Sequence, residues 1–219
     1  MSVDYRMLAH RITNIEERMH AIGGDVSQVK IEAAASPHQI AQCENQVGCK
    51  LPESFKKVLL EFSSALYFRW VFPDDFQLEG EIVGIFSGKL YWDIGLLKEI
   101  NENKNAWITN VFSNPDNDYD KVWHHTLAFY EVGNGDYLAF DLDENSSDAG
   151  VIYLSHDDGQ GHGYKLADNF IDFLEKWSSV AFVGGEDWQW LAFTANPQSG
   201  LLPESQCAKS FRSLLKLTS

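Results

Sequence analysis

Five aspartates in the second half of the chain have types and spacing that suit a metal ion or a charged partner. They are Asp136, Asp141, Asp143, Asp157 and Asp158. Two histidines, His156 and His162, lie close to the last two in sequence. Oxygen and imidazole ligands of this kind suit manganese, zinc or iron. A group of carboxylates also attracts a basic protein surface and fixes the register in which the two meet. The group therefore offers two chemistries, metal coordination and recognition of a basic partner.

The spacing of these residues does not match the common metal-binding motifs. Asp141-x-Asp143-x-Asn145 lacks the Gly and the closing Glu of a calcium loop. The sequence contains no His-Glu-x-x-His helix motif. We therefore expect an exposed acidic loop with no metal and no other cofactor, and a metal-dependent hydrolase is the lesser alternative.

Nucleophilic catalysis requires a Ser or Cys beside a base, and no recognisable motif supplies one. There is no Gly-x-Ser-x-Gly elbow, and Cys43, Cys49 and Cys207 lie in no catalytic motif. The glycine-rich run 159–163 resembles a phosphate loop only loosely, because position 164 is Tyr and the two preceding aspartates would repel a phosphate. We predict no catalytic residue and no enzymatic activity.

The net charge of the chain indicates which kinds of partner it can bind. The chain has 32 Asp+Glu against 17 Lys+Arg, a formal net charge of −15. Thirteen of the acids lie in residues 131–190, where only Lys165 and Lys176 oppose them, so this segment alone carries −11. Such a charge repels nucleic-acid phosphates and anionic membranes. We expect a basic protein partner, no nucleic acid and no membrane, with Trp188 and Trp190 as candidate exposed aromatic anchors.

Length and composition predict one globular domain of generous size with terminal extensions. The 219 residues are 44% apolar and 13% aromatic, enough to form a core. No run approaches 18 apolar residues, so we expect no transmembrane helix, and the charges among the first 20 residues are not typical of a signal peptide. An odd number of cysteines without disulfide spacing favours a reducing, cytoplasmic location.

Apolar spacing predicts helices at both ends and in the middle of the chain. A seam of six apolar residues between Asp4 and Ile22 predicts a helix that docks on its own domain, rather than a coiled coil with a partner. Ser36-Pro37-His38-Gln39 has the form of a capping box, and Leu51-Pro52 opens the next helix. The remaining predicted helices span residues 93–112, begin at Asp168 or Asn169, and span residues 203–217.

Strands are predicted over residues 67–72, 81–86, 126–132, 137–142 and 151–154. The clearest signal is Gly133-Asn134-Gly135, because Asn-Gly favours a two-residue hairpin turn. In the strand that follows, alternate apolar residues share one face, and Asp141 and Asp143 share the other. This alternation predicts that both carboxylates point away from the core, side by side.

Four blocks of sequence, taken in order, resemble the SUKH superfamily, which groups fungal cell-wall-synthesis regulators of the Smi/Knr type with many bacterial proteins. They are the helical entry Gly48-Cys49-Lys50-Leu51-Pro52-Glu53-Ser54-Phe55-Lys56, the hairpin Gly133-Asn134-Gly135-Asp136-Tyr137-Leu138-Ala139-Phe140-Asp141, the strand and loop Val151-Ile152-Tyr153-Leu154-Ser155-His156-Asp157, and the helix Phe170-Ile171-Asp172-Phe173-Leu174. The chain departs from the family's pattern at Ser63-Ser64-Ala65, where members often have Asn-Gly.

The resemblance implies an α+β fold, in agreement with the predicted element order: a mainly antiparallel sheet flanked by helices. It divides the chain into an N-terminal helical extension over residues 1–28, a SUKH-like domain over 29–193 and a C-terminal helical extension over 194–219. It also implies a non-catalytic binding role. Many bacterial members are immunity proteins that neutralise a toxin delivered between competing cells, whereas fungal members are regulatory scaffolds.

The hypothesis from sequence is an immunity protein that occludes a basic toxin domain. Its predicted partner-binding residues are Asp136, Asp141, Asp143, Asp157, Asp158 and Trp188. A regulatory scaffold that binds several endogenous proteins is the alternative, and in that case the terminal helices are where added contacts would lie.

Overall fold

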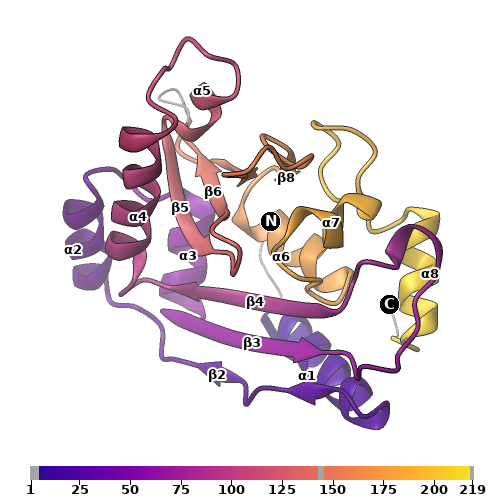
Figure 1. Cartoon of the computed structure of the whole chain (residues 1–219). Helices are drawn as coiled ribbons and strands as arrows, with labels where there is room; N and C mark the ends of the chain where they lie inside the picture. The colour runs from indigo at the N-terminus through magenta and orange to yellow at the C-terminus, as the bar shows by residue number, and fades with distance from the viewer. Residues whose placement is uncertain (1–4, 143–145, 218–219) are drawn as a thin grey trace.

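The computed structural model describes residues 5–142 and 146–217. Within them the chain forms two four-stranded antiparallel sheets with helices packed around them (Figure 1). The predicted α+β class is therefore confirmed, although the strands divide into two sheets instead of one.

The first sheet is built around β3 (Ala65–Val71). All seven of its residues pair with β4 (Ser87–Asp93), while β1 (Asp25–Val26) and β2 (Lys30–Ile31) follow one another along its other edge. Side chains alternate between the two faces of a strand. As a result, Leu66, Phe68 and Trp70 enter the core and the residues between them face outward.

The second sheet is a meander of four strands: β5 (Thr126–Glu131), β6 (Tyr137–Asp141), β7 (Gly150–Leu154) and β8 (Lys165–Ala167). Both of its faces are buried. Leu138 and Phe140 enter the main core, while Tyr137 and Ala139 enter a second cluster that also contains Trp123. The face of β6 predicted to point away from the core is therefore covered along most of its length.

Over the described ranges, six helices lie close to where the sequence predicts them, and two short ones of four residues each lie where it predicts none. They are α1 (Tyr5–Ala21), α2 (Pro37–Val47), α3 (Glu53–Glu61), α4 (Leu97–Asn110), α5 (Asp120–Trp123), α6 (Phe170–Ser179), α7 (Asp187–Trp190) and α8 (Gln206–Leu214), with 3₁₀ turns η1 (Gly80–Ile82) and η2 (Leu191–Phe193). The capping box at Ser36 is present, and Asn169 is the N-cap of α6. No helix in the described part of the chain is long and apolar enough to cross a membrane.

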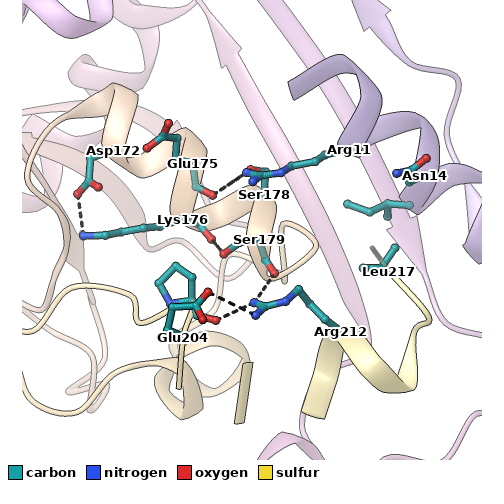
Figure 2. Close-up of a pocket in the computed structure, with 12 residues that line it drawn as sticks. Arg11, Asn14, Asp172, Glu175, Lys176, Ser178, Ser179, Glu204, Arg212 and Leu217 are labelled. Atoms are coloured by element: carbon teal, nitrogen blue, oxygen red, sulfur yellow. Dashed lines mark hydrogen bonds and ion pairs between the residues drawn. The ribbon is translucent and has the colours of Figure 1, made fainter. Parts of the chain in front are cut away.

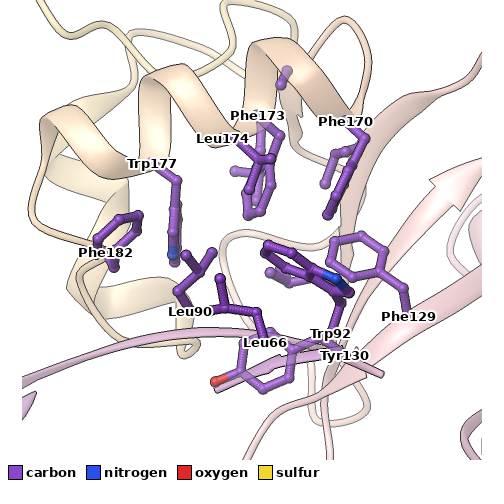
Figure 3. Close-up of a cluster of buried hydrophobic side chains, with 14 of the residues drawn as sticks. Leu66, Leu90, Trp92, Phe129, Tyr130, Phe170, Phe173, Leu174, Trp177 and Phe182 are labelled. Atoms are coloured by element: carbon purple, nitrogen blue, oxygen red, sulfur yellow. The ribbon is translucent and has the colours of Figure 1, made fainter. Parts of the chain in front are cut away.

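The main core lies beneath α6, whose apolar face contacts both sheets. Figure 3 shows Phe170 beside Phe129 and Trp92, and Trp177 beside Leu90. The Trp92 and Phe170 rings meet edge to face with centroids 5.7 Å apart, and the Phe129 and Phe170 rings do so at 5.3 Å. Edge-to-face packing is the geometry that aromatic quadrupoles favour. One helix thus joins the two sheets.

The terminal helices are part of this fold. The α1 residues Leu8, Ile12, Ile15 and Met19 are all buried in the main core. At the other end of the chain, Phe211 of α8 packs on Phe193 with ring centroids 5.6 Å apart. The prediction that the first helix docks on its own domain is confirmed.

Two predictions about strands and turns were wrong. Residues 81–86 form η1 and irregular chain instead of a strand, because the N–H groups of Val83 and Ile85 bind carbonyls three residues back, and the strand starts only at Ser87. The hairpin loop has three residues instead of two. Within Gly133-Asn134-Gly135 only Gly135 has a positive φ (98°), whereas a two-residue type I′ turn needs two such residues.

A tight contact in the first sheet generates a stability prediction. A Cβ added at Gly88 would lie 2.2 Å from Nε1 of Trp70, whose buried indole donates a hydrogen bond to the Ala181 carbonyl. We expect Gly88→Ala to lower the free energy of unfolding by about 1–3 kcal/mol, as overpacking does. The matched control is Gly133→Ala, because a Cβ there meets nothing within 4 Å. Urea denaturation of the two variants measures the difference, and equal stability would contradict the packing argument.

Candidate functional site

Asp136, predicted to face a partner, is a buried structural residue. Its side chain is 1% exposed and accepts four hydrogen bonds. Oδ1 accepts from the backbone N–H of His156 at 2.8 Å and from Nδ1 of the same residue at 2.7 Å. Oδ2 accepts from Nδ2 of Asn134 at 2.7 Å and from the Tyr153 hydroxyl. The prediction of Asp136 as a partner-binding residue was therefore wrong, since its carboxylate fixes the hairpin turn to the loop after β7.

The same hydrogen bonds bear on the metal-binding alternative. Among the described residues, Asp136, His156 and Asp157 offer ligand atoms that lie within 4.8 Å of one another. A carboxylate has about four lone-pair sites, and those of Asp136 are occupied by protein donors. His156 must keep a proton on Nδ1 to donate to Asp136. The arrangement is a hydrogen-bonded anchor, and a metal ion would have to break it.

His162 anchors the far end of the loop. Its Nδ1 accepts from the Ser155 N–H at 3.1 Å and its Nε2 lies 3.0 Å from the Tyr119 carbonyl, so the ring is neutral with its proton on Nε2. The ring also stacks on Tyr119 with centroids 3.7 Å apart. Burial lowers the pKa of His162 below its ordinary value of 6.5, against the raising effect of the Tyr119 carbonyl and of Asp136. These contacts and those of Asp136 hold the loop over residues 155–162 at both of its ends.

The short helix α7 is fixed on both sides of Trp188. The buried Asp187 carboxylate accepts the Gly161 N–H at 2.8 Å, which attaches the loop to the helix. Gln189 is fully buried and accepts from the N–H groups of Phe86 and Ser87. Trp188 lies between these two anchored residues and is 50% exposed, whereas Trp190, also predicted as an anchor, is fully buried. An aromatic side chain is therefore held at the surface by a rigid backbone.

The other predicted partner-binding residues are divided between the two ends of the second sheet. Asp157 and Asp158 are exposed on the loop that Asp136, His162 and Asp187 hold in place. Asp141 is also exposed, but it pairs with Gly150 at the opposite end of β6 from the hairpin turn. Asp143 lies outside the described residues. Asp157 and Asp158 thus lie on a loop that is bonded to α7, the helix that carries Trp188, and Asp141 lies elsewhere. We call this loop and helix, with the three exposed residues, the loop–helix surface.

Two exposed apolar residues near this surface were missed. Val83 is 68% exposed and Phe86 is 48% exposed. They flank Gly84, at which a Cβ would lie 3.4 Å from the Trp188 ring. Interpreting residues 81–86 as a strand hid them, because a strand would have turned one of its faces inward. Nothing in their spacing indicated that the segment packs against α7.

These features define the class of protein: an α+β protein in which Asp136 stabilises the fold, with aromatic and acidic side chains exposed on neighbouring segments. The model described as the SMI1 / KNR4 family (SUKH-1) matches residues 34–176, and the chain belongs to this family. Proteins of the SUKH family act through protein interactions. Comparison with curated proteins finds no match to the chain.

The hydrogen bonds of Asp136 predict that replacing this residue destabilises the fold, whereas replacing an exposed aspartate does not. In Asp136→Asn an amide group replaces one oxygen and faces hydrogen-bond donors, so buried donors lose their acceptor. We expect the free energy of unfolding to fall by about 2–4 kcal/mol. Asp158→Asn is the matched control, since Asp158 is exposed with φ 62°, a conformation that Asn tolerates. Urea denaturation that finds the two variants equally stable would contradict the anchor role.

The lowered pKa of His162 predicts that the protein becomes less stable as the pH falls. Because burial lowers the pKa of the folded-state histidine below 6.5, the unfolded chain binds the proton first as the pH falls. The contribution of His162 to the free energy of unfolding is therefore fully present above pH ~6.5 and declines below it. NMR titration of the ring and urea denaturation at pH 7.5 and 5.5 measure both quantities. We expect His162→Gln to reduce the pH dependence and His38→Gln, at an exposed site, to retain it. A ring midpoint above 6.5 would refute this account.

Proposed function

We propose that this protein is an immunity protein that binds a toxin domain and blocks it by occlusion. Membership of a family whose proteins act through protein interactions supports a non-catalytic binding role. The observation that carries the proposal is Trp188, half exposed on a helix that buried contacts fix on both sides. A rigid aromatic side chain loses little entropy when a partner covers it, which suits an interface anchor.

The charges around this anchor support a basic partner. Asp157 and Asp158 are exposed on the loop that Asp187 attaches to α7. Their loop is held by the bonds to Asp136 and His162, so these carboxylates need little reordering on binding. Complementary charge speeds encounter and fixes register, while buried aromatic contact slows dissociation. A toxin with a basic surface groove would meet both requirements.

Immunity and scaffolding predict different partners. An immunity protein has one dedicated toxin and protects the cell that makes both, whereas a scaffold binds several endogenous proteins. Co-expression with each reading frame next to its gene tests this directly. We expect one neighbouring product to be toxic alone, harmless with this protein, and recovered with it as a stoichiometric complex. Recovery of several endogenous proteins with no protection against a neighbouring product would contradict immunity and favour the scaffold.

The loop–helix surface makes a kinetic prediction for that complex. We expect Trp188→Ala to weaken binding by about 30-fold, mainly through faster dissociation. Replacing Asp157 and Asp158 together with Lys should slow association about tenfold at low salt and reduce its salt dependence. Asp141→Lys, an acidic residue at the other end of β6, is the matched control and should retain wild-type binding. Surface plasmon resonance at two salt concentrations measures both rates. A larger effect of Asp141→Lys than of the double variant would place the interface at that end instead.

A further inference from the structure

A pocket of about 410 Å³ lies where the two ends of the chain meet α6. Figure 2 shows its wall: α1 contributes Arg11 and Asn14, the end of α6 contributes Ser178 and Ser179, and the C-terminal segment contributes Arg212. This volume lies in the range of small-molecule sites. Nine of its twelve lining residues fall outside the stretch that the family model matches, so the pocket belongs to the parts of this chain that the family model does not describe.

Two guanidinium groups bind the C-terminal end of α6, one from α1 and the other from α8. Arg11 donates from Nη1 to the Ser178 hydroxyl at 2.7 Å and to the Glu175 carbonyl at 3.2 Å. Arg212 donates from Nη1 to the Pro203 carbonyl at 2.7 Å and to the Ser179 carbonyl at 3.3 Å. Each guanidinium has five N–H donors. Within the described residues these hydrogen bonds involve only Nη1, so Arg11 keeps unused N–H donors, whereas Nη2 of Arg212 lies 3.7 Å from Glu204.

Three carboxylates, of Asp172, Glu175 and Glu204, line the pocket, and two of them form ion pairs. Asp172 pairs with Lys176 at 2.7 Å and also accepts the Asp168 N–H. Glu204 lies 3.2 Å from Lys209 and 3.7 Å from Nη2 of Arg212. Arg11, in contrast, forms no ion pair with any residue in the described ranges. The lining is therefore balanced in formal charge, and Arg11 is the basic residue in it that carries no carboxylate partner among the described residues.

The remaining wall is apolar. Ile15 from α1, Pro203 and Leu217 line the pocket beside the two arginines. A ligand that fits both parts carries an anionic group for the guanidinium forks and a short hydrocarbon part for the apolar wall. We propose that this pocket binds a small organic carboxylate with a branched aliphatic group. The site is separate from the loop–helix surface and does not depend on the proposed function.

Matched probes separate the two parts of the proposal. ¹H–¹⁵N NMR spectra of the full chain are recorded at constant ionic strength with 4-methylpentanoate, its uncharged amide, and acetate. We expect saturable shifts for 4-methylpentanoate, with a Kd on the order of a millimolar, centred on residues 175–179 and 203–217. The amide and acetate should bind at least about tenfold more weakly. Equal shifts with the amide would overturn the anionic part, and equal affinity for acetate would overturn the aliphatic part.

Variants test the assignment to the arginines. Arg212→Gln and Arg11→Gln should each weaken 4-methylpentanoate binding about tenfold. The control is Arg69→Gln, which removes an exposed arginine on β3 and should bind as the wild type does. Because both pocket arginines also hold the end of α6, thermal unfolding is measured for each variant. The shift map of the wild-type protein locates the ligand without any substitution, and shifts that lie away from α1, α6 and the C-terminal segment would overturn the proposal even if a variant fails to fold.

Discussion

The aromatic face of α6 is the contact on which the rest of the structure depends, because it joins the two sheets. Phe170 packs against Phe129 of one sheet and Trp92 of the other, and Trp177 donates a hydrogen bond to the Lys89 carbonyl at 3.1 Å. Burying side chains of this size supplies much of the apolar area that drives folding. The terminal helices add to this unit, and the end of α6 forms the floor of the pocket between them.

The exposed segments are held by a different kind of contact, hydrogen bonds to buried polar side chains. A buried carboxylate without partners would be costly, whereas one with four donors holds whatever carries those donors. Asp136 holds the hairpin turn and the start of the loop in this way, and Asp187 and Gln189 hold α7. Side chains exposed on these segments, Trp188 among them, are therefore presented in a defined position.

Local patterns predicted the elements well and the burial of individual polar residues poorly. Capping at Ser36 and the apolar spacing of α1 and α6 are properties of a few neighbouring residues, so they can be recognised in the sequence. The fate of Asp136 depends on Tyr153 and His156, which are distant in the chain and meet it only across paired strands. The same holds at the end of segment 81–86, where the backbone N–H groups of Phe86 and Ser87 bind the side chain of Gln189, about 100 positions later.

The acidic segment illustrates why charge counted along a sequence overstates charge available to a partner. Of the acidic residues between positions 131 and 190, Asp136 and Asp187 are buried and hydrogen-bonded, and Asp168 and Asp172 form ion pairs with lysines. Asp141 is exposed at a different end of the sheet from Asp157 and Asp158. The net charge of −11 in this segment is therefore distributed over the fold, and some of its carboxylates stabilise the fold itself. A net charge summed along a segment therefore describes long-range attraction, whereas the geometry of a bound complex depends on which carboxylates are exposed and held in place.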